Sequence, residues 1–224
     1  MDFSKPRAKK SKKIKIKPAK ILIAYEGAVS EKEYFEELKS KIPRQFVNLI
    51  DFIPVGKTDY SRSSPSQVLQ DLIRSEHYNQ KAISKGIDYA FIVIDKDHHF
   101  DDTHARDSVQ ALQMCRQKNI SVVCSTPSFD LWRLLHCSAV NTYSVEKKSK
   151  ILSNNNRYVK TLCTQCGIGA TFNYFELIPN GIFNAEQLNS SCQNSNIPNE
   201  ELFTNMTSIF NVFNELNVNI FKYI

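Results

Sequence analysis

The chain has 224 residues, of which 42% are hydrophobic and 23% charged, a composition typical of a globular protein with room for one domain and an extension or for two small domains. No apolar run approaches the roughly 18 residues that cross a bilayer. No apolar segment of signal-peptide length follows the basic N-terminus. These features argue against a membrane protein and against a secreted one.

The net charge of +6 is concentrated at the N-terminus. Residues 1–20 hold nine Lys or Arg and one acid, whereas the remaining 204 residues carry a net charge of −2. We predict that residues 1–19 form a basic tail that is disordered in isolation. Such a tail could neutralise several phosphates of a nucleic acid, or it could serve only to keep the protein in solution.

Six cysteines are present, an even number that would suit disulfides in a small secreted domain. The chain is long and lacks an export signal, and Cys115 and Cys124 fall in patterned segments, so we expect reduced thiols in a cytoplasmic protein. Cys163 and Cys166 form a lone Cys-x-x-Cys pair. Structural zinc takes four ligands, and Cys192 alone leaves the set short, so a zinc site is not expected here.

The first elements expected are a buried strand at residues 21–25 and a helix that ends before Pro43. Ser30-Glu31-Lys32-Glu33 has the pattern of a capping box, in which the Ser30 hydroxyl accepts a hydrogen bond from the amide of Glu33. A second strand is expected within residues 47–55.

A polar loop then leads to a helix that starts at Ser64-Pro65. The apolar run at residues 89–94 predicts the third strand. A helix over residues 105–118, a strand over residues 120–124 and a helix over residues 129–136 are expected to follow. This alternation predicts an α/β fold with a mostly parallel sheet flanked by helices.

After residue 143 the pattern weakens, and the one further element expected is an amphipathic helix over residues 202–216. We therefore predict one folded domain over residues 20–140. The helical C-terminal extension, residues 141–224, is expected to pack on it.

Carboxylates follow two of the expected strands: Glu26 comes directly after the first, and Asp95 and Asp97 come directly after the third. Ligands of open α/β sheets bind beyond the carboxyl ends of the strands, and alternate residues of an extended segment point the same way. If the two strands are neighbours, the three carboxylates converge, and a divalent cation would relieve their repulsion. Oxygen ligands favour Mg²⁺ or Mn²⁺ over zinc.

Four segments together resemble the RloB family: ILIAYEG at residues 21–27, Glu33-x-Phe35, FIVIDKD at residues 91–97 and TPSFDLWRLLH at residues 126–136. The Glu-Gly and Asp-x-Asp pairs are more broadly similar to the Toprim domain of topoisomerases, primases and some nucleases. The resemblance covers residues 20–140. It implies a Toprim fold, a Mg²⁺-dependent nuclease activity and a role in bacterial defence against phage, sometimes beside a partner ATPase.

A metal site of this type would lower the pKa of a bound water and stabilise the charge that develops in phosphodiester hydrolysis. Asp95 and Asp97 would hold the metal, and Glu26 would bind a second metal or act as a general acid or base. The resemblance adds Asp130 to the catalytic residues, although the family usually has Glu at that position. The alternative for Asp130 is an ordinary acid in the first turn of a helix.

Further residues are candidates for contacts with substrate. Lys57 and Arg62 lie in the loop after the second strand, where they would either clamp phosphate or belong to a surface loop. His98 and His99 lie in the polar loop after the third strand and are expected to touch substrate rather than bind metal. His136 would contact phosphate or, as we favour, simply end a helix.

Two other functions compete with a metal-dependent nuclease that cleaves RNA or DNA. One is a non-catalytic subunit of a defence system that binds nucleic acid or an ATPase partner, in which the acids are structural. The other is a phosphohydrolase with Asp95 as nucleophile, which ranks last because His99 stands where that chemistry wants Thr or Val. The chain has no P-loop motif, so any ATP hydrolysis would come from a partner.

Overall fold

The computed structural model describes residues 17–59, 63–96, 105–169, 172–190 and 201–223. Its centre is a five-stranded sheet in the order β2-β1-β3-β4-β5. The parallel strands are β1 (Ala19–Tyr25), β2 (Ile50–Val55), β3 (Tyr89–Asp95) and β4 (Ser121–Thr126), and β5 (Phe203–Thr204) runs antiparallel to β4. The expected mostly parallel sheet flanked by helices is confirmed. Most of the predicted basic tail, residues 1–16, lies outside the described residues.

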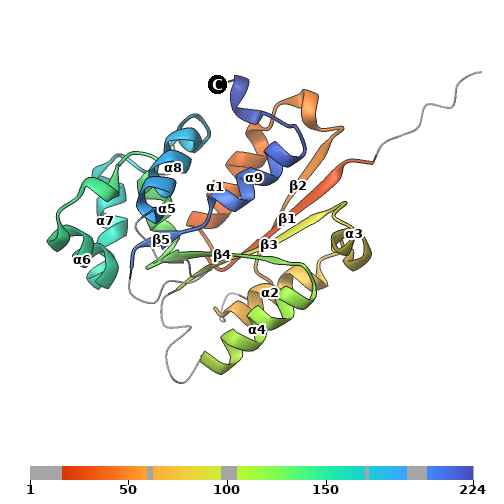
Figure 1. Cartoon of the computed structure of the whole chain (residues 1–224), viewed down its shortest axis with the longest axis horizontal. Coiled ribbons are helices and arrows are strands. Elements are labelled where there is room, and N and C mark those ends of the chain that lie inside the picture. The colour runs from red at the N-terminus through yellow and green to blue at the C-terminus, as the bar shows by residue number, and fades with distance from the viewer. Residues whose placement is uncertain (1–16, 60–62, 97–104, 170–171, 191–200, 224) are drawn as a thin grey trace, which may run out of the picture.

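Helices cover both faces of the sheet (Figure 1). One face packs against α1 (Ser30–Lys41), α5 (Phe129–Leu135), α8 (Tyr174–Asn189) and α9 (Thr207–Glu215). The other face packs against α2 (Pro65–Arg74), α3 (Gln80–Ser84) and α4 (Ala105–Gln117). Short 3-10 turns lie at η1 (Arg44–Phe46), η3 (Val140–Thr142) and η5 (Ile220–Tyr223).

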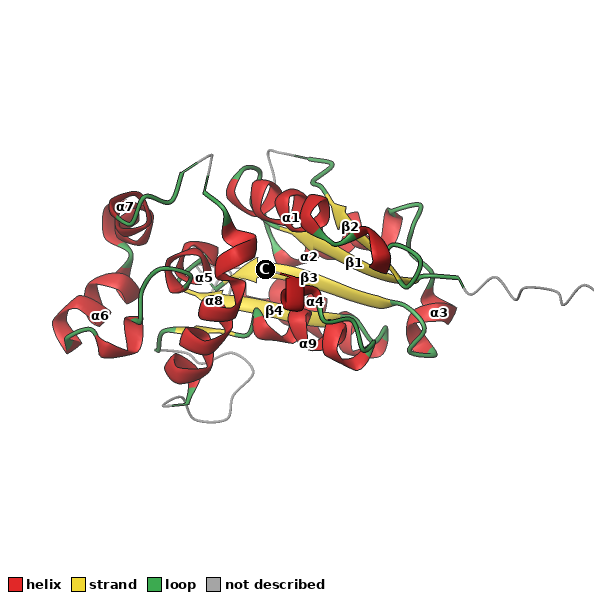
Figure 2. Cartoon of the chain, turned by 90° about the horizontal axis from the view of Figure 1, so that it is seen from above, coloured by secondary structure: helices red, strands yellow, loops and turns green. Residues whose placement is uncertain are grey.

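The central strand β1 is apolar on both sides because both helical layers cover it. Ile21 and Ile23 point into the layer of α1 and α9, and Leu22 and Ala24 point into the layer of α2 and α4. Figure 1 shows the sheet between these layers, and Figure 2 views it from the side of α1 and α9. Burial of both faces specifies the register of this strand, and its polar neighbours lie at its two ends, with Lys20 near the amino end and Glu26 directly after the carboxyl end.

The starts of two helices test the capping patterns read from the sequence. At α2 the Ser64 hydroxyl accepts a hydrogen bond from the amide of Gln67 at 3.2 Å, as predicted. At α1 the predicted capping box is wrong: Ser30 is the first helical residue, and the amide of Glu33 donates to the carbonyl of Val29 at 2.9 Å. The Ser30 hydroxyl instead accepts from Arg133 in α5, a long-range contact that no local pattern contains.

The chain after residue 143 is more ordered than its sequence pattern predicts. α6 (Val145–Ser153), the 3-10 turn η4 (Asn155–Arg157) and α7 (Tyr158–Gln165) precede α8. The helix expected over residues 202–216 begins only at Thr207, because Phe203 and Thr204 pair with β4 as β5. One core of buried residues runs from Ile21 to Ile220, so the first strand and the C-terminal elements are packed together.

A side chain closes much of the outer edge of β4. Asn205 Oδ1 accepts from the amide of Cys124 at 2.7 Å, and its Nδ2 donates to the carbonyl of Val122 at 3.0 Å. The Asn205 amide group therefore takes the place of a further strand. Within the described ranges, none of the helices has the length and apolar character needed to span a membrane.

Candidate functional site

Glu26 and Asp95 meet at the carboxyl ends of two neighbouring strands. β1 pairs with β3 in parallel, and the amide of Glu26 donates to the carbonyl of Val93 at 3.1 Å. The carboxylate oxygen Oε2 of Glu26 accepts from the amide of Asp95 at 3.3 Å, and Oε1 accepts from the Ser63 hydroxyl at 2.6 Å. The sheet order thus brings together two acids that are 69 residues apart in the chain.

The N-terminus of α5 closes over Asp95. The amide of Phe129, the first residue of that helix, donates to Asp95 Oδ1 at 2.7 Å. Just before it, the hydroxyl of Ser128 is buried and has no hydrogen-bond partner among the described residues. Asp95 therefore receives a backbone amide from a helix terminus, and an unsatisfied hydroxyl lies next to that amide in the chain.

Glu31 is a further acid of this site, one to which the sequence pattern assigned no role. It lies in the first turn of α1, is 7% exposed, and shares the buried face of that helix with Tyr34 and Phe35. Its carboxylate covers Gly27, and a Cβ at that glycine would overlap the carboxylate oxygens. The available sequence signal is that Glu31 continues the apolar stripe of the helix, where a solvated acid is not expected.

Asp130 is held by the buried Arg133. Arg133 Nη1 donates to Asp130 Oδ1 at 2.6 Å and to the Ser30 hydroxyl at 3.1 Å, and its Nε donates to the Tyr174 hydroxyl at 2.7 Å. Burial opposes the charge of Arg133, but its hydrogen bonds to Asp130 and Tyr174 outweigh burial and raise its pKa. This guanidinium ties α5 to α1 and α8 and fixes the position of Asp130.

Burial and mutual repulsion disfavour the ionised form of two of these acids. Desolvation raises the pKa of Asp95 well above its usual value, and the charges of Glu31 and Glu26 raise it further, although the amide of Phe129 acts in the opposite direction. Desolvation likewise raises the pKa of Glu31 to about 7, with added repulsion from Asp130 and Glu26. The carboxylates therefore share one electrostatic environment.

A family model for RloB-like proteins matches residues 21–216. The chain belongs to the RloB-like family. The match extends past residue 140, where the motif resemblance ends, and includes α6 to α9, in keeping with the core that these elements share with β1. No curated protein and no solved structure matches the chain.

Several residues expected at the site of this RloB-like chain are not placed by the structure. Asp97, His98, His99 and Arg62 lie outside the described residues. Lys57 is partly buried in the loop directly after β2, the strand next to β1, and so lies at the expected edge of the sheet.

His136 lies in the core of the protein and is 1% exposed. Its Nδ1 lies 2.9 Å from the carbonyl oxygen of Trp132, and its Nε2 lies 3.4 Å from the Tyr34 hydroxyl. Desolvation lowers its pKa to about 4, so the ring is neutral near pH 7. Contact between this imidazole and a phosphate would require the surrounding helices to separate.

The carboxylate oxygen atoms of the RloB-like site are the type of ligand that a hard divalent cation prefers. Glu26, Glu31, Asp95 and Asp130 supply only oxygen atoms, and the pKa values of Glu31 and Asp95 are raised first by desolvation and then by repulsion from neighbouring carboxylates. As the side chains lie, no group of three or more His, Cys, Asp or Glu among the described residues is arranged to hold a metal ion. Asp97, the second acid of the Asp-x-Asp pair, lies outside the described residues.

Proposed function

We propose that this RloB-like protein is a Toprim nuclease that uses Mg²⁺ or Mn²⁺ to cleave phosphodiester bonds of RNA or DNA, and that it acts in the cytoplasm as an effector of defence against phage. The observation that carries the proposal is the crowding of Glu26, Glu31, Asp95 and Asp130 beyond β1 and β3. The pKa values of Glu31 and Asp95 are raised, and strongly perturbed acids cluster at functional sites. A divalent cation would offset their repulsion.

Each acid has a role in this proposal. Asp95, together with Asp97, would hold the cation, and Glu26 would act as general acid or base or bind a second cation. When bound, the cation would supply an activated water and stabilise the charge on the phosphate. Asp130, fixed by Arg133, and Glu31 would complete the ring of oxygen donors.

The decisive experiment compares Asp95→Asn with the wild type. The substitution keeps the size of the side chain and removes its negative charge, so Mg²⁺-dependent cleavage of RNA and plasmid DNA should fall by orders of magnitude. Melting temperature, measured on the same samples in metal-free buffer, should stay level or rise, because repulsion with Glu31 and Glu26 is relieved.

Asp51→Asn is the matched control, because Asp51 is exposed and lies near the amino end of β2, away from the strand ends that carry the acids. It should leave both cleavage and melting temperature unchanged. Full activity of Asp95→Asn with Mg²⁺ present would refute the nuclease proposal and favour a binding subunit. Parallel reactions with a separately encoded ATPase partner would show whether cleavage depends on such a partner.

A further inference from the structure

The second half of the chain contains a concentrated group of positive charges. Residues 144–160 hold five basic residues and one acid, a net charge of +4. Residues 21–143 and 161–224 together hold 15 basic and 21 acidic residues, a net charge of −6. The segment of α6, η4 and α7, residues 145–165, which we call the basic hairpin, therefore carries the positive charge of an otherwise acidic body.

The local structure of the basic hairpin exposes three of its five positive charges to solvent. Ser144 caps α6, and Asn154 ends it in the left-handed conformation. Arg157, with a φ of 56°, is also left-handed and forms the tip of the turn before α7. Lys150, Arg157 and Lys160 are all exposed.

Exposed polar groups follow one line along α7. Arg157, Lys160, Thr161 and Thr164 are exposed and recur at the spacing of one helix face. Arg157 and Lys160 form no ion pair with any described residue, whereas Lys150 pairs with Glu146 at 2.7 Å. The two cations suit the oxygen atoms of phosphate groups, whereas the hydroxyls of Thr161 and Thr164 already donate to the carbonyls of Arg157 and Lys160 at 3.4 Å and 3.1 Å.

The basic hairpin is fixed to the helix that carries the acidic site. On the buried side of α7, the Cys163 thiol donates to the carbonyl oxygen of Asp130 in α5 at 3.4 Å. In Figures 1 and 2 the hairpin lies at the end of the molecule toward which β1 and β3 run, and the chain enters β1 at the opposite end. The charges of the hairpin are thus on the side of the acids, and the start of β1 is on the far side.

We infer that the exposed face of the basic hairpin binds the phosphate backbone of the nucleic acid whose cleavage is proposed above, an inference that rests on that proposed function. Net positive charge on an acidic body favours a polyanion, because the body itself repels nucleic acid elsewhere. Partly exposed Tyr158 adds a ring on which a base can stack, whereas Lys147 Nζ lies 3.5 Å from the centroid of the Tyr143 ring and covers one of its faces. A lipid surface would require an apolar face, and Val145 alone does not form one.

The test is a binding titration in the inactive Asp95→Asn background, so that the nucleic acid stays intact. The probes are a fluorescent single-stranded RNA and a duplex DNA of the same sequence. Lys150→Gln, Arg157→Gln and Lys160→Gln together should weaken binding about tenfold or more near physiological salt. The magnitude of the slope of log affinity against log salt should decrease by about 2 for the single-stranded RNA and by about 3 for the duplex, since each phosphate contact contributes about 0.7 and about 0.9 respectively.

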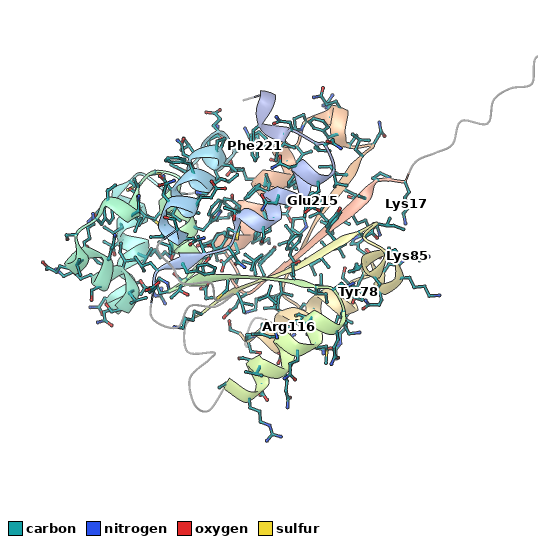
Figure 3. All side chains as sticks on the ribbon, in the orientation of Figure 1. Lys17, Tyr78, Lys85, Arg116, Glu215 and Phe221 are labelled. Atoms are coloured by element: carbon teal, nitrogen blue, oxygen red, sulfur yellow. The ribbon has the colours of Figure 1, made fainter. Side chains whose placement is uncertain are left out.

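The matched control carries Lys81→Gln, Lys85→Gln and Arg116→Gln, which remove the same charge from exposed positions on and after α3 and on α4 (Figure 3). The affinity of this control variant and the salt dependence of its binding should stay close to those of the Asp95→Asn protein that carries no further substitution. Equal losses in the two triple variants would overturn the inference, as would unchanged binding by the hairpin variant. Binding of the parent to vesicles of anionic lipid, but to neither nucleic acid, would also overturn it.

This experiment separates the hairpin from the catalytic proposal. If the hairpin variant binds nucleic acid normally while Asp95→Asn abolishes cleavage, the binding role of the basic hairpin is refuted and the nuclease proposal stands. If the hairpin variant loses binding and Asp95→Asn still cleaves, the binding role of the basic hairpin is supported and the catalytic role proposed for the acids is refuted.

Discussion

Replacing Glu31 with Gln should make this protein more stable at alkaline pH and leave its stability unchanged near pH 4.5. The carboxyl of Glu31 has an ordinary pKa of 4.5 and a pKa of about 7 in the folded protein, chiefly because it is desolvated. Between these values the folded state holds more protons than the unfolded state, so the free energy of unfolding falls as pH rises through this interval. The glutamine amide of the variant does not titrate in this range and therefore escapes the penalty.

The size of the effect follows from the shift. A difference of about 2.5 pH units corresponds to about 3 kcal/mol at pH 8, shared in part with Asp95 and Glu26, whose charges act on the same group. For a protein of this size that is an increase in melting temperature of about 6–12 °C. The assay is thermal and urea unfolding of both proteins in chelator-treated buffer from pH 4.5 to pH 8.

The pH dependence of His136 has the opposite sign and must be separated from that of Glu31. Its pKa of about 4 in the folded state lies below the ordinary value of 6.5, so stability is lost as pH falls through that range. Because His136 is present in both proteins, its contribution cancels in the difference between the variant and the wild type. That difference is therefore the quantity to measure.

Glu33→Gln is the matched control, since Glu33 also lies in the first turn of α1 but is exposed. It loses the same small interaction with the helix dipole, about 0.5 kcal/mol, without gaining any relief from burial. A difference between Glu31→Gln and the wild type that stays constant from pH 4.5 to pH 8 would refute the assignment of Glu31 as a buried, repelled acid.

Other substitutions test neighbouring contacts. Gly27→Ala should displace the Glu31 carboxylate, lowering stability by about 1–3 kcal/mol in urea unfolding and reducing any cleavage activity. Arg133→Met should cost about 3–5 kcal/mol because it leaves a partly buried carboxylate without its cation, and Tyr174→Phe, which loses one hydrogen bond of Arg133, should cost only about 1 kcal/mol. Asn205→Ala should lower the free energy of unfolding by about 2 kcal/mol and speed amide exchange in β4.

The strands and most helices before residue 140 follow from local patterns, and the structure agrees. Apolar runs of strand length, the Ser64-Pro65 helix start and the acid after each buried strand all depend on neighbours in sequence. The adjacency of β1 and β3, on which the meeting of Glu26 and Asp95 depends, could be expected only as one arrangement of an α/β sheet.

The features that local sequence patterns did not predict depend on contacts with residues far away in the chain. Ser30 could be expected to cap its own helix, but Arg133, 103 residues away, takes its hydroxyl as an acceptor. Glu31 looks like an ordinary first-turn acid until the packing of its helix face buries it. Residues 203–204 continue an amphipathic pattern, yet the open edge of β4 recruits them as a strand.

The asparagine at the edge of β4 also bears on self-association. An exposed strand edge offers a row of amide donors and carbonyl acceptors that another chain can extend into an aggregate. At Val122 and Cys124 those groups are already bonded to the Asn205 side chain, and at the opposite edge β2 carries Pro54, which has no amide hydrogen. A second chain would have to break two hydrogen bonds on the part of β4 that β5 leaves uncovered and would lack a donor at Pro54 of β2, so both of these places resist growth of the sheet into a fibril.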